Sequence, residues 1–258
     1  MAEPPAPWPE RAPGAPPPPP PPAAPLAPRG TWGLGDVVGG LAVAQVAPVL
    51  FGAALLIALG YTDADAIDTL PLTVIAVLQI PLWLGYLGAP LFASIRKGQG
   101  IVRDYGWRFE RRDIGVGLGI GVLTQFVAVP LLYVPIFLIF GEQDVSEAAR
   151  ELTDRATDPL GVILLVLVVV VGAPIIEELF FRGLFHQAIV KRGGHPWLAV
   201  AVTSVVFGGI HFQLLQLPAL VLFGVVAGWL TVRHGRLGPA VWAHVGFNGV
   251  TVAVLLLT

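Results

Sequence analysis

Long apolar stretches, each sufficient to cross a lipid bilayer, follow one another along most of this chain. A transmembrane helix needs about 20 apolar residues with a rise of about 1.5 Å each, and the run "LAVAQVAPVLFGAALLIALG" from Leu41 to Gly60 contains no charged residue. We expect about seven such spans. They lie at 34–60, 70–95, 114–140, 159–182, 197–213, 217–232 and 238–257. The sequence therefore predicts an all-α fold, a polytopic transmembrane helical bundle.

The composition supports this class and excludes others. Hydrophobic residues make up 55% of the chain and charged residues 12%, and the mean hydropathy is +0.77, which is far from the values of soluble domains. Membrane lipid is the expected environment. A formal net charge of -2 lacks the concentrated basic face that nucleic-acid binding requires, so no nucleic acid is expected as a partner.

The first thirty residues differ from the rest. They are dominated by proline and alanine and contain no run that could span a bilayer, which predicts a disordered cytoplasmic tail over 1–30. A partner that recognises polyproline helices is conceivable for it, but its identity is unknown and a solvated spacer is favoured. Residues 31–258 are expected to form the membrane-embedded domain.

The short polar segments alternate in charge. Basic segments occur at 96–113, 190–195 and 232–236, whereas 61–68 and 141–158 are mainly acidic. Since lysine and arginine resist translocation, the basic segments are expected on the cytoplasmic side. This predicts an integral membrane protein, in a bacterial plasma membrane, with its N-terminus in the cytoplasm and its C-terminus outside. Within the third span, Gly117 and Gly121 have the spacing at which two transmembrane helices pack closely.

Three charged residues lie inside the fourth apolar run, in "GAPIIEELFFRGLFHQ". Glu178 and Arg182 are four residues apart and can pair on one helix face, while Glu177 is rotated by about 100° and has no equivalent basic partner on this helix. A carboxylate held in apolar surroundings without a basic partner is suited to accept a proton. A purely structural role, in which the cluster pins helices together, is the alternative.

Complementary polar residues occur in two later spans. Phe207 and His211 are four apart in "SVVFGGIHFQ", and His244 and Asn248 are four apart in "VWAHVGFNGV", so each pair is expected on one face of a helix. Single histidines in such helices are usually packed core residues. A functional site is favoured here, because three helices together contribute a glutamate, two histidines and an asparagine. His186, His195 and His234 are expected at the membrane interface.

These residues carry a resemblance. In order along the chain, Glu-Glu-x-x-x-Arg, Phe-x-x-x-His and His-x-x-x-Asn resemble the motifs of the CPBP family of intramembrane proteases, which includes CAAX-processing and bacteriocin-processing enzymes and is also called the Abi family. The similarity covers about Leu160 to the C-terminus and implies a protease-like core in 160–258.

The resemblance implies hydrolysis of a peptide bond in a membrane-associated protein or peptide, which in eukaryotic members lies near the C-terminus of a prenylated substrate. It implies that Glu177 activates water, that His211 and His244 assist or bind a metal, and that Asn248 stabilises the oxyanion. Glu178 and Arg182 complete the motif. Zinc held by His211 and His244 and a metal-free glutamate mechanism both fit these residue types.

Two other functions remain open: a catalytically silent scaffold or bacteriocin-immunity protein of the same fold, and a proton-coupled transporter. The site also depends on a geometric condition. Counted from the basic loops, His244 lies about 10 Å shallower than Glu177 and His211. The levels agree only if the hairpin around "KRGGH" projects beyond the membrane, which would place the site in its cytoplasmic half.

Overall fold

The computed structural model describes residues 30–63 and 69–257. Within these ranges every regular element is a helix, and no strand occurs, so the predicted helical bundle is confirmed. The tail expected over 1–30 lies outside the described residues except for Gly30.

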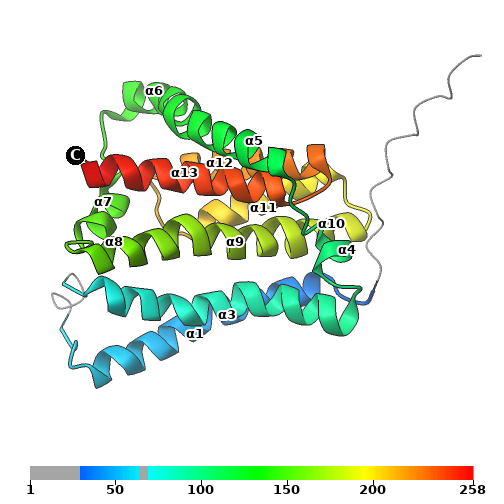
Figure 1. The fold of residues 1–258 in the computed structure, drawn as a ribbon, viewed down its shortest axis with the longest axis horizontal. Coiled ribbons are helices and arrows are strands. Elements are labelled where there is room, and N and C mark those ends of the chain that lie inside the picture. Colours follow the sequence, from blue (N-terminus) through cyan, green and yellow to red (C-terminus); the bar gives the residue numbers. More distant parts are fainter. Residues whose placement is uncertain (1–29, 64–68, 258) are drawn as a thin grey trace, which may run out of the picture.

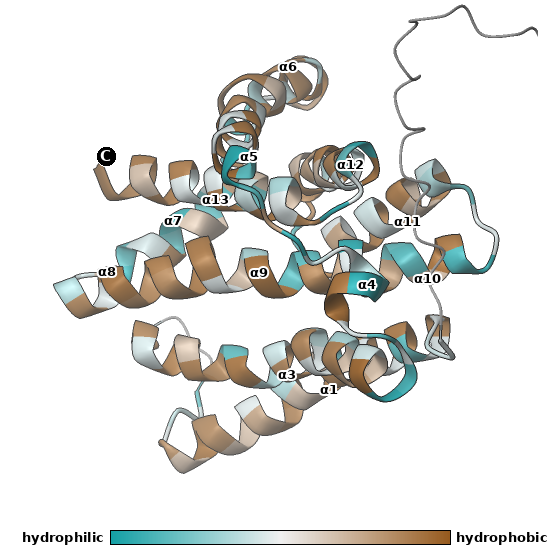
Figure 2. Cartoon of the chain, turned by 45° about the vertical axis from the view of Figure 1, so that its right-hand side comes forward, coloured by the Kyte–Doolittle hydropathy of each residue, from teal (hydrophilic) through white to brown (hydrophobic). Residues whose placement is uncertain are grey.

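Six helices of the described chain are long and apolar enough to cross a membrane. Four of them are single elements: α1 (Leu34–Ala58), α3 (Leu72–Lys97), α12 (Leu217–His234) and α13 (Gly238–Leu257). Their outer surfaces are rich in apolar side chains, which Figure 2 shows in brown along α1 and α3. Since such surfaces are stable only in contact with lipid, the protein is an integral membrane protein.

The other two spans are interrupted by π-helical turns. The first joins α5 (Arg111–Leu123) to α6 (Val129–Phe140) through Thr124–Ala128. The second runs without a break from Pro159 to Lys191. Its parts are α8 (Pro159–Leu165), π-helix Val166–Gly172, α9 (Ala173–Glu178), π-helix Leu179–Phe185 and α10 (His186–Lys191).

Pro174 explains part of this irregularity. It lies at the start of α9, and a proline cannot donate the backbone hydrogen bond of a regular helical turn. The π-turn Val166–Gly172 before α9 contains the carbonyl groups that this N–H would have reached, and such turns are frequent at functional sites. Glu177 and Glu178 are the last two residues of α9, the short α-helix between the two π-turns.

The fifth expected span, 197–213, is shorter than predicted. Helix α11 (Pro196–Gly209) has 14 residues and covers about 21 Å, less than the hydrocarbon core. It ends where Gly208 and Gly209, poor helix formers, precede Phe212, whose φ is 54°. His211 therefore lies in the turn after α11 and not on the helix.

Acidic and basic loops gather at opposite ends of the bundle. Figure 1 shows α7 (Glu147–Asp154) and the C-terminal end of α13 together at one end, and α4 (Ile101–Tyr105) and α10 at the other. We call these the acidic end and the basic end. The turn between α10 and α11 extends beyond the turn between α12 and α13 in both views (Figures 1 and 2). This direction agrees with the projection that the predicted site required, while the depth of the site in the membrane stays a prediction.

Glycines bring α5 and α13 into close contact. A Cβ atom at Gly117 or Gly121 would overlap backbone atoms of α13, and one at Gly246 would lie 2.8 Å from the Leu118 carbonyl oxygen. The helix-packing role expected for Gly117 and Gly121 is confirmed. The contact fixes α13, which carries His244 and Asn248.

A salt bridge fixes the start of α13. Arg236 binds Asp113 of α5 through Nε at 3.0 Å and Nη2 at 2.6 Å. The hydrogen bonds to Asp113 raise the pKa of the Arg236 guanidinium above its ordinary value, so the group remains charged. Because Arg236 lies two residues before α13, the pair anchors this helix at the basic end.

Candidate active site

Glu178 and Arg182 form an ion pair in the centre of the bundle. Arg182 Nη1 lies 3.0 Å from Glu178 Oε1, and both side chains are fully buried. Arg182 Nη2 donates to the Gly224 carbonyl at 3.0 Å, and the guanidinium lies over the Phe207 ring at 4.8 Å. The pairing expected from the four-residue spacing is confirmed.

His244 of α13 binds the same carboxylate. Its Nδ1 lies 2.9 Å from Glu178 Oε1. Since an ionised carboxylate can only accept, Nδ1 carries the proton and donates it. The Nε2 atom then faces the neighbouring Glu177, whose Oε2 is 3.9 Å away. This contact between Glu178 and His244 was not expected from the sequence.

Glu177 differs from Glu178 in its surroundings. Its side chain is 12% exposed, whereas that of Glu178 is 0% exposed, and it lines a cavity. Among the described residues, its ion-pair partner within 4 Å is His244. As predicted, Arg182 pairs with Glu178 and leaves the Glu177 carboxylate accessible.

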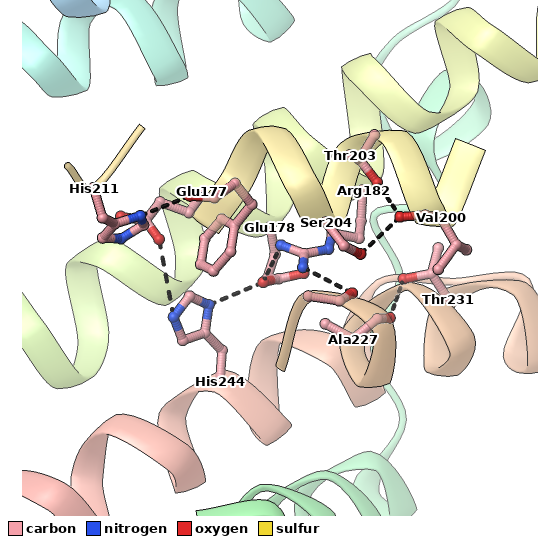
Figure 3. A network of polar contacts seen from close by, with 12 residues as sticks. Glu177, Glu178, Arg182, Val200, Thr203, Ser204, His211, Ala227, Thr231 and His244 are labelled. Carbon is pink, nitrogen blue, oxygen red and sulfur yellow. Dashed lines mark hydrogen bonds and ion pairs between the residues drawn. The ribbon is translucent and has the colours of Figure 1, made fainter. Parts of the chain in front are cut away.

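His211 reaches the site from the turn after α11. Its Nδ1 lies 2.7 Å from the Phe207 carbonyl oxygen, so Nδ1 donates and Nε2 is free to accept. Figure 3 shows the side chains of Glu177, His211 and His244 turned toward one another. Phe207 and His211, which were expected one helical turn apart, are thus joined by a hydrogen bond, although α11 ends between them.

Asn248 lies one turn beyond His244 on α13. Its Nδ2 donates to the Val169 carbonyl oxygen at 2.8 Å, within the first π-helical segment of the fourth span. A primary amide has two N–H groups and a carbonyl oxygen. One N–H of Asn248 therefore remains for another acceptor, and its orientation is fixed by the first.

These residues surround one cavity of about 360 Å³, which we call the site cavity. Glu177, His211, His244 and Asn248 line it, while Glu178 and Arg182 lie behind His244. It extends to α7, at the acidic end of the bundle (Figure 1). The sequence interpretation missed three glutamines in its wall, Gln79, Gln213 and Gln216. Gln79 could have been noticed as a polar residue inside the second apolar run.

The three remaining histidines do not line the site cavity. His195 caps α11 by accepting from Trp197 N at 3.3 Å, and His234 ends α12 at the basic end. His186, expected at the membrane interface, is only 3% exposed, so its side chain is enclosed by protein; its depth in the membrane stays a prediction. It lies one turn beyond Arg182, on the stripe that faces the bundle interior.

The side-chain atoms available around the cavity determine whether the predicted zinc could bind there. In the described part of the chain, no group of three or more His, Cys, Asp or Glu side chains has the spacing of a metal site. Both Nδ1 atoms are engaged, so Nε2 of His211, Nε2 of His244 and the Glu177 carboxylate are the donors that remain. Two histidines and a glutamate are a donor set that catalytic zinc sites use together with water, but in this arrangement they are not grouped as a metal site, so zinc remains a prediction.

The fold and these polar residues define a class: an integral membrane protein whose helices enclose two glutamates, two histidines and an asparagine around a cavity. Residues 159–250 match the family described as type II CAAX prenyl endopeptidase Rce1-like. The resemblance to membrane proteases of the CPBP type is thereby confirmed over this part of the chain.

Two curated proteins are similar to parts of this chain. The chain is 26% identical over 140 residues to "Putative membrane peptidase YdiL" of Bacillus subtilis, covering 54% of each chain. It is 31% identical over 141 residues to an uncharacterized 24.3 kDa protein of Escherichia coli, covering 52% of this chain and 62% of that protein. The match thus spans less than two thirds of either relative. No solved structure matches the chain significantly.

Proposed function

We propose that this protein is an intramembrane endopeptidase that hydrolyses a peptide bond of a membrane-associated protein or peptide. The observation that carries the proposal is the pair of glutamates. One is neutralised and buried, and the other faces His244 from the wall of a cavity large enough for water and a peptide segment. The match to a protease family supports the same reaction class.

Glu177 is the base in this proposal. The 3.9 Å between its Oε2 and His244 Nε2 is too long for a direct hydrogen bond, so a water on the cavity side can contact both groups. Glu177 takes a proton from this water, and the hydroxide attacks the carbonyl carbon of the peptide. His244 holds the water, and Glu178 holds His244 through Nδ1.

The attack places a negative charge on the former carbonyl oxygen. The free N–H of Asn248 can donate to this oxyanion, with its direction fixed in advance by the bond to Val169. When the carbon–nitrogen bond breaks, the protonated Glu177 returns its proton to the leaving nitrogen. His211 Nε2 faces the same space and can accept from the water or from the substrate.

The experiment compares membrane-associated peptides and new protein termini in cells that produce the protein, Glu177→Gln or Glu142→Gln. Glu142 is an exposed glutamate in the loop after α6 and serves as the matched control. We expect cleavage products in the parent and in Glu142→Gln that are absent in Glu177→Gln. Identical peptide sets in all three strains would contradict the proposal and favour the silent scaffold or immunity protein.

A further inference from the structure

Three glutamines line the site cavity in addition to the motif residues. Gln79 comes from α3, eight residues into a span of 26 residues, and Gln213 and Gln216 come from the turn between α11 and α12. That turn is held from the side of α6, because the Tyr133 hydroxyl donates to the Leu215 carbonyl oxygen. Helix α3 and the turn between α11 and α12 therefore present these glutamines to the same site cavity.

Their side chains make no hydrogen bond or ion pair within the described ranges 30–63 and 69–257. Glutamines outside the cavity differ among themselves: Gln45 Nε2 donates to the Tyr86 hydroxyl at 3.0 Å, whereas the buried Oε1 of Gln125 has no partner in the described residues. All three cavity glutamines are part-buried at the cavity wall, where water can satisfy them until a ligand displaces it. Because the described part of the fold uses none of these three amides, all of them are available to a ligand in the site cavity.

The remaining wall indicates what kind of ligand fits. Apart from the motif residues and these glutamines, apolar side chains dominate it, among them Trp83, Leu165, Leu220 and Phe223. Glu177 is the one Asp, Glu, Lys or Arg side chain among the described residues of this wall. A ligand with apolar side chains and many neutral hydrogen-bonding groups matches it.

An unwound peptide segment has this chemistry. A transmembrane substrate is helical, and its backbone must leave the helix before a peptide bond can be attacked. The exposed N–H and C=O groups then need partners inside the membrane. A primary amide donates and accepts at once, so one glutamine can bind both groups of a peptide unit.

We propose that Gln79, Gln213 and Gln216 bind the main chain of an extended, apolar substrate segment across the site cavity. This inference rests on the proposed function and adds the mode of substrate recognition. Backbone binding makes recognition tolerant of sequence and selects for segments that can unwind. The glutamines hold the peptide, while Glu177 and Asn248 act on its scissile bond.

The test uses the full chain in detergent micelles with a library of tryptic peptides from a membrane fraction, and mass spectrometry identifies those that are cut. Gln79→Leu, Gln213→Leu and Gln216→Leu are compared on one cleaved peptide with the control Gln125→Leu, a span glutamine outside the cavity wall. Each cavity variant should raise KM about 2- to 13-fold with little change in kcat. The control should leave both unchanged.

A backbone scan separates recognition from general damage. Peptide N–H groups near the scissile bond are replaced one at a time by ester oxygen. At the position bound by a given glutamine, the ester should weaken cleavage by the parent but not further weaken cleavage by the matching leucine variant. Unchanged KM in all three variants, or purely additive losses at every position, would overturn this inference while leaving hydrolysis in place. A parent that cuts no peptide would overturn both proposals.

Discussion

Glu178 Oε1 accepts from two side chains at once, His244 Nδ1 at 2.9 Å and Arg182 Nη1 at 3.0 Å. One buried oxygen thus joins the fourth span to the last span and fixes the ring orientation of His244. A carboxylate on Nδ1 also selects the tautomer, because Nδ1 must carry the proton. Glu178 is therefore a positioning residue as well as an anchor for Arg182.

Glu178→Gln should chiefly lower the stability of the protein, and activity should fall as a consequence. The amide is neutral, so Arg182 is left as an uncompensated buried charge, and breaking such a pair costs about 3–5 kcal/mol. We expect reduced membrane yield and a lower midpoint of thermal unfolding, measured by intrinsic fluorescence in detergent. A fully stable Glu178→Gln protein would show that this ion pair does not hold the bundle.

Glu177→Gln should have the opposite profile. Its side chain faces the cavity and pairs with no arginine of the described residues, so the unfolding midpoint should stay near that of the parent. Hydrolysis of a cleaved peptide should fall by about 10²–10⁴-fold, as is typical when a general base is lost. If Glu177→Gln cleaves normally while a well-folded Glu178→Gln is inactive, the two roles are reversed.

Local spacing made part of this site predictable. Glu178 and Arg182 pair because residues four apart lie on one helix face, and the short motifs placed Glu177, His211 and His244 together. Hydropathy likewise predicted the bundle, since each span must satisfy its own backbone hydrogen bonds.

Other features depend on contacts between distant segments. The bond from His244 to Glu178 joins residues 66 positions apart, and no periodicity encodes it. The early end of α11 depends on a glycine pair and the backbone of Phe212. How α3, α10 and the turn before α12 pack determines that His186 is buried and that the three glutamines line the cavity. A single sequence does not specify this packing.

The contact between α5 and α13 gives a test with a matched control. A Cβ at Gly121 would overlap the backbone of α13, whereas a Cβ at Gly119 would meet no heavy atom within 4 Å. Gly121→Ala should therefore destabilise the protein by about 1–3 kcal/mol, as overpacking does. It should also reduce hydrolysis, since α13 carries His244. Gly119→Ala should be neutral or stabilising by up to about 1 kcal/mol. Equal unfolding midpoints for the two variants would show that the close packing is not required.

Metal analysis separates the two mechanisms that the motifs allow. The glutamate mechanism predicts that protein purified with chelators and free of metal keeps its hydrolytic activity. Zinc bound near stoichiometrically in the parent and lost in both His211→Ala and His244→Ala would instead assign these histidines as ligands. Elemental analysis by mass spectrometry, together with activity before and after chelation, distinguishes the outcomes.

The orientation in the membrane determines from which side a peptide can reach the site cavity. The cavity extends to α7, which lies at the acidic end (Figure 1), and the loop charges predict that this end faces outward. The chain has no cysteine, so single cysteines can be introduced as probes. Gln99→Cys at the basic end and Gln143→Cys at the acidic end replace exposed neutral residues and leave the loop charges intact. In intact cells, a membrane-impermeant thiol reagent should label Gln143→Cys, whereas Gln99→Cys should react only after lysis. The reverse pattern would invert the orientation and open the cavity toward the cytoplasm, so that a substrate would have to enter from that side.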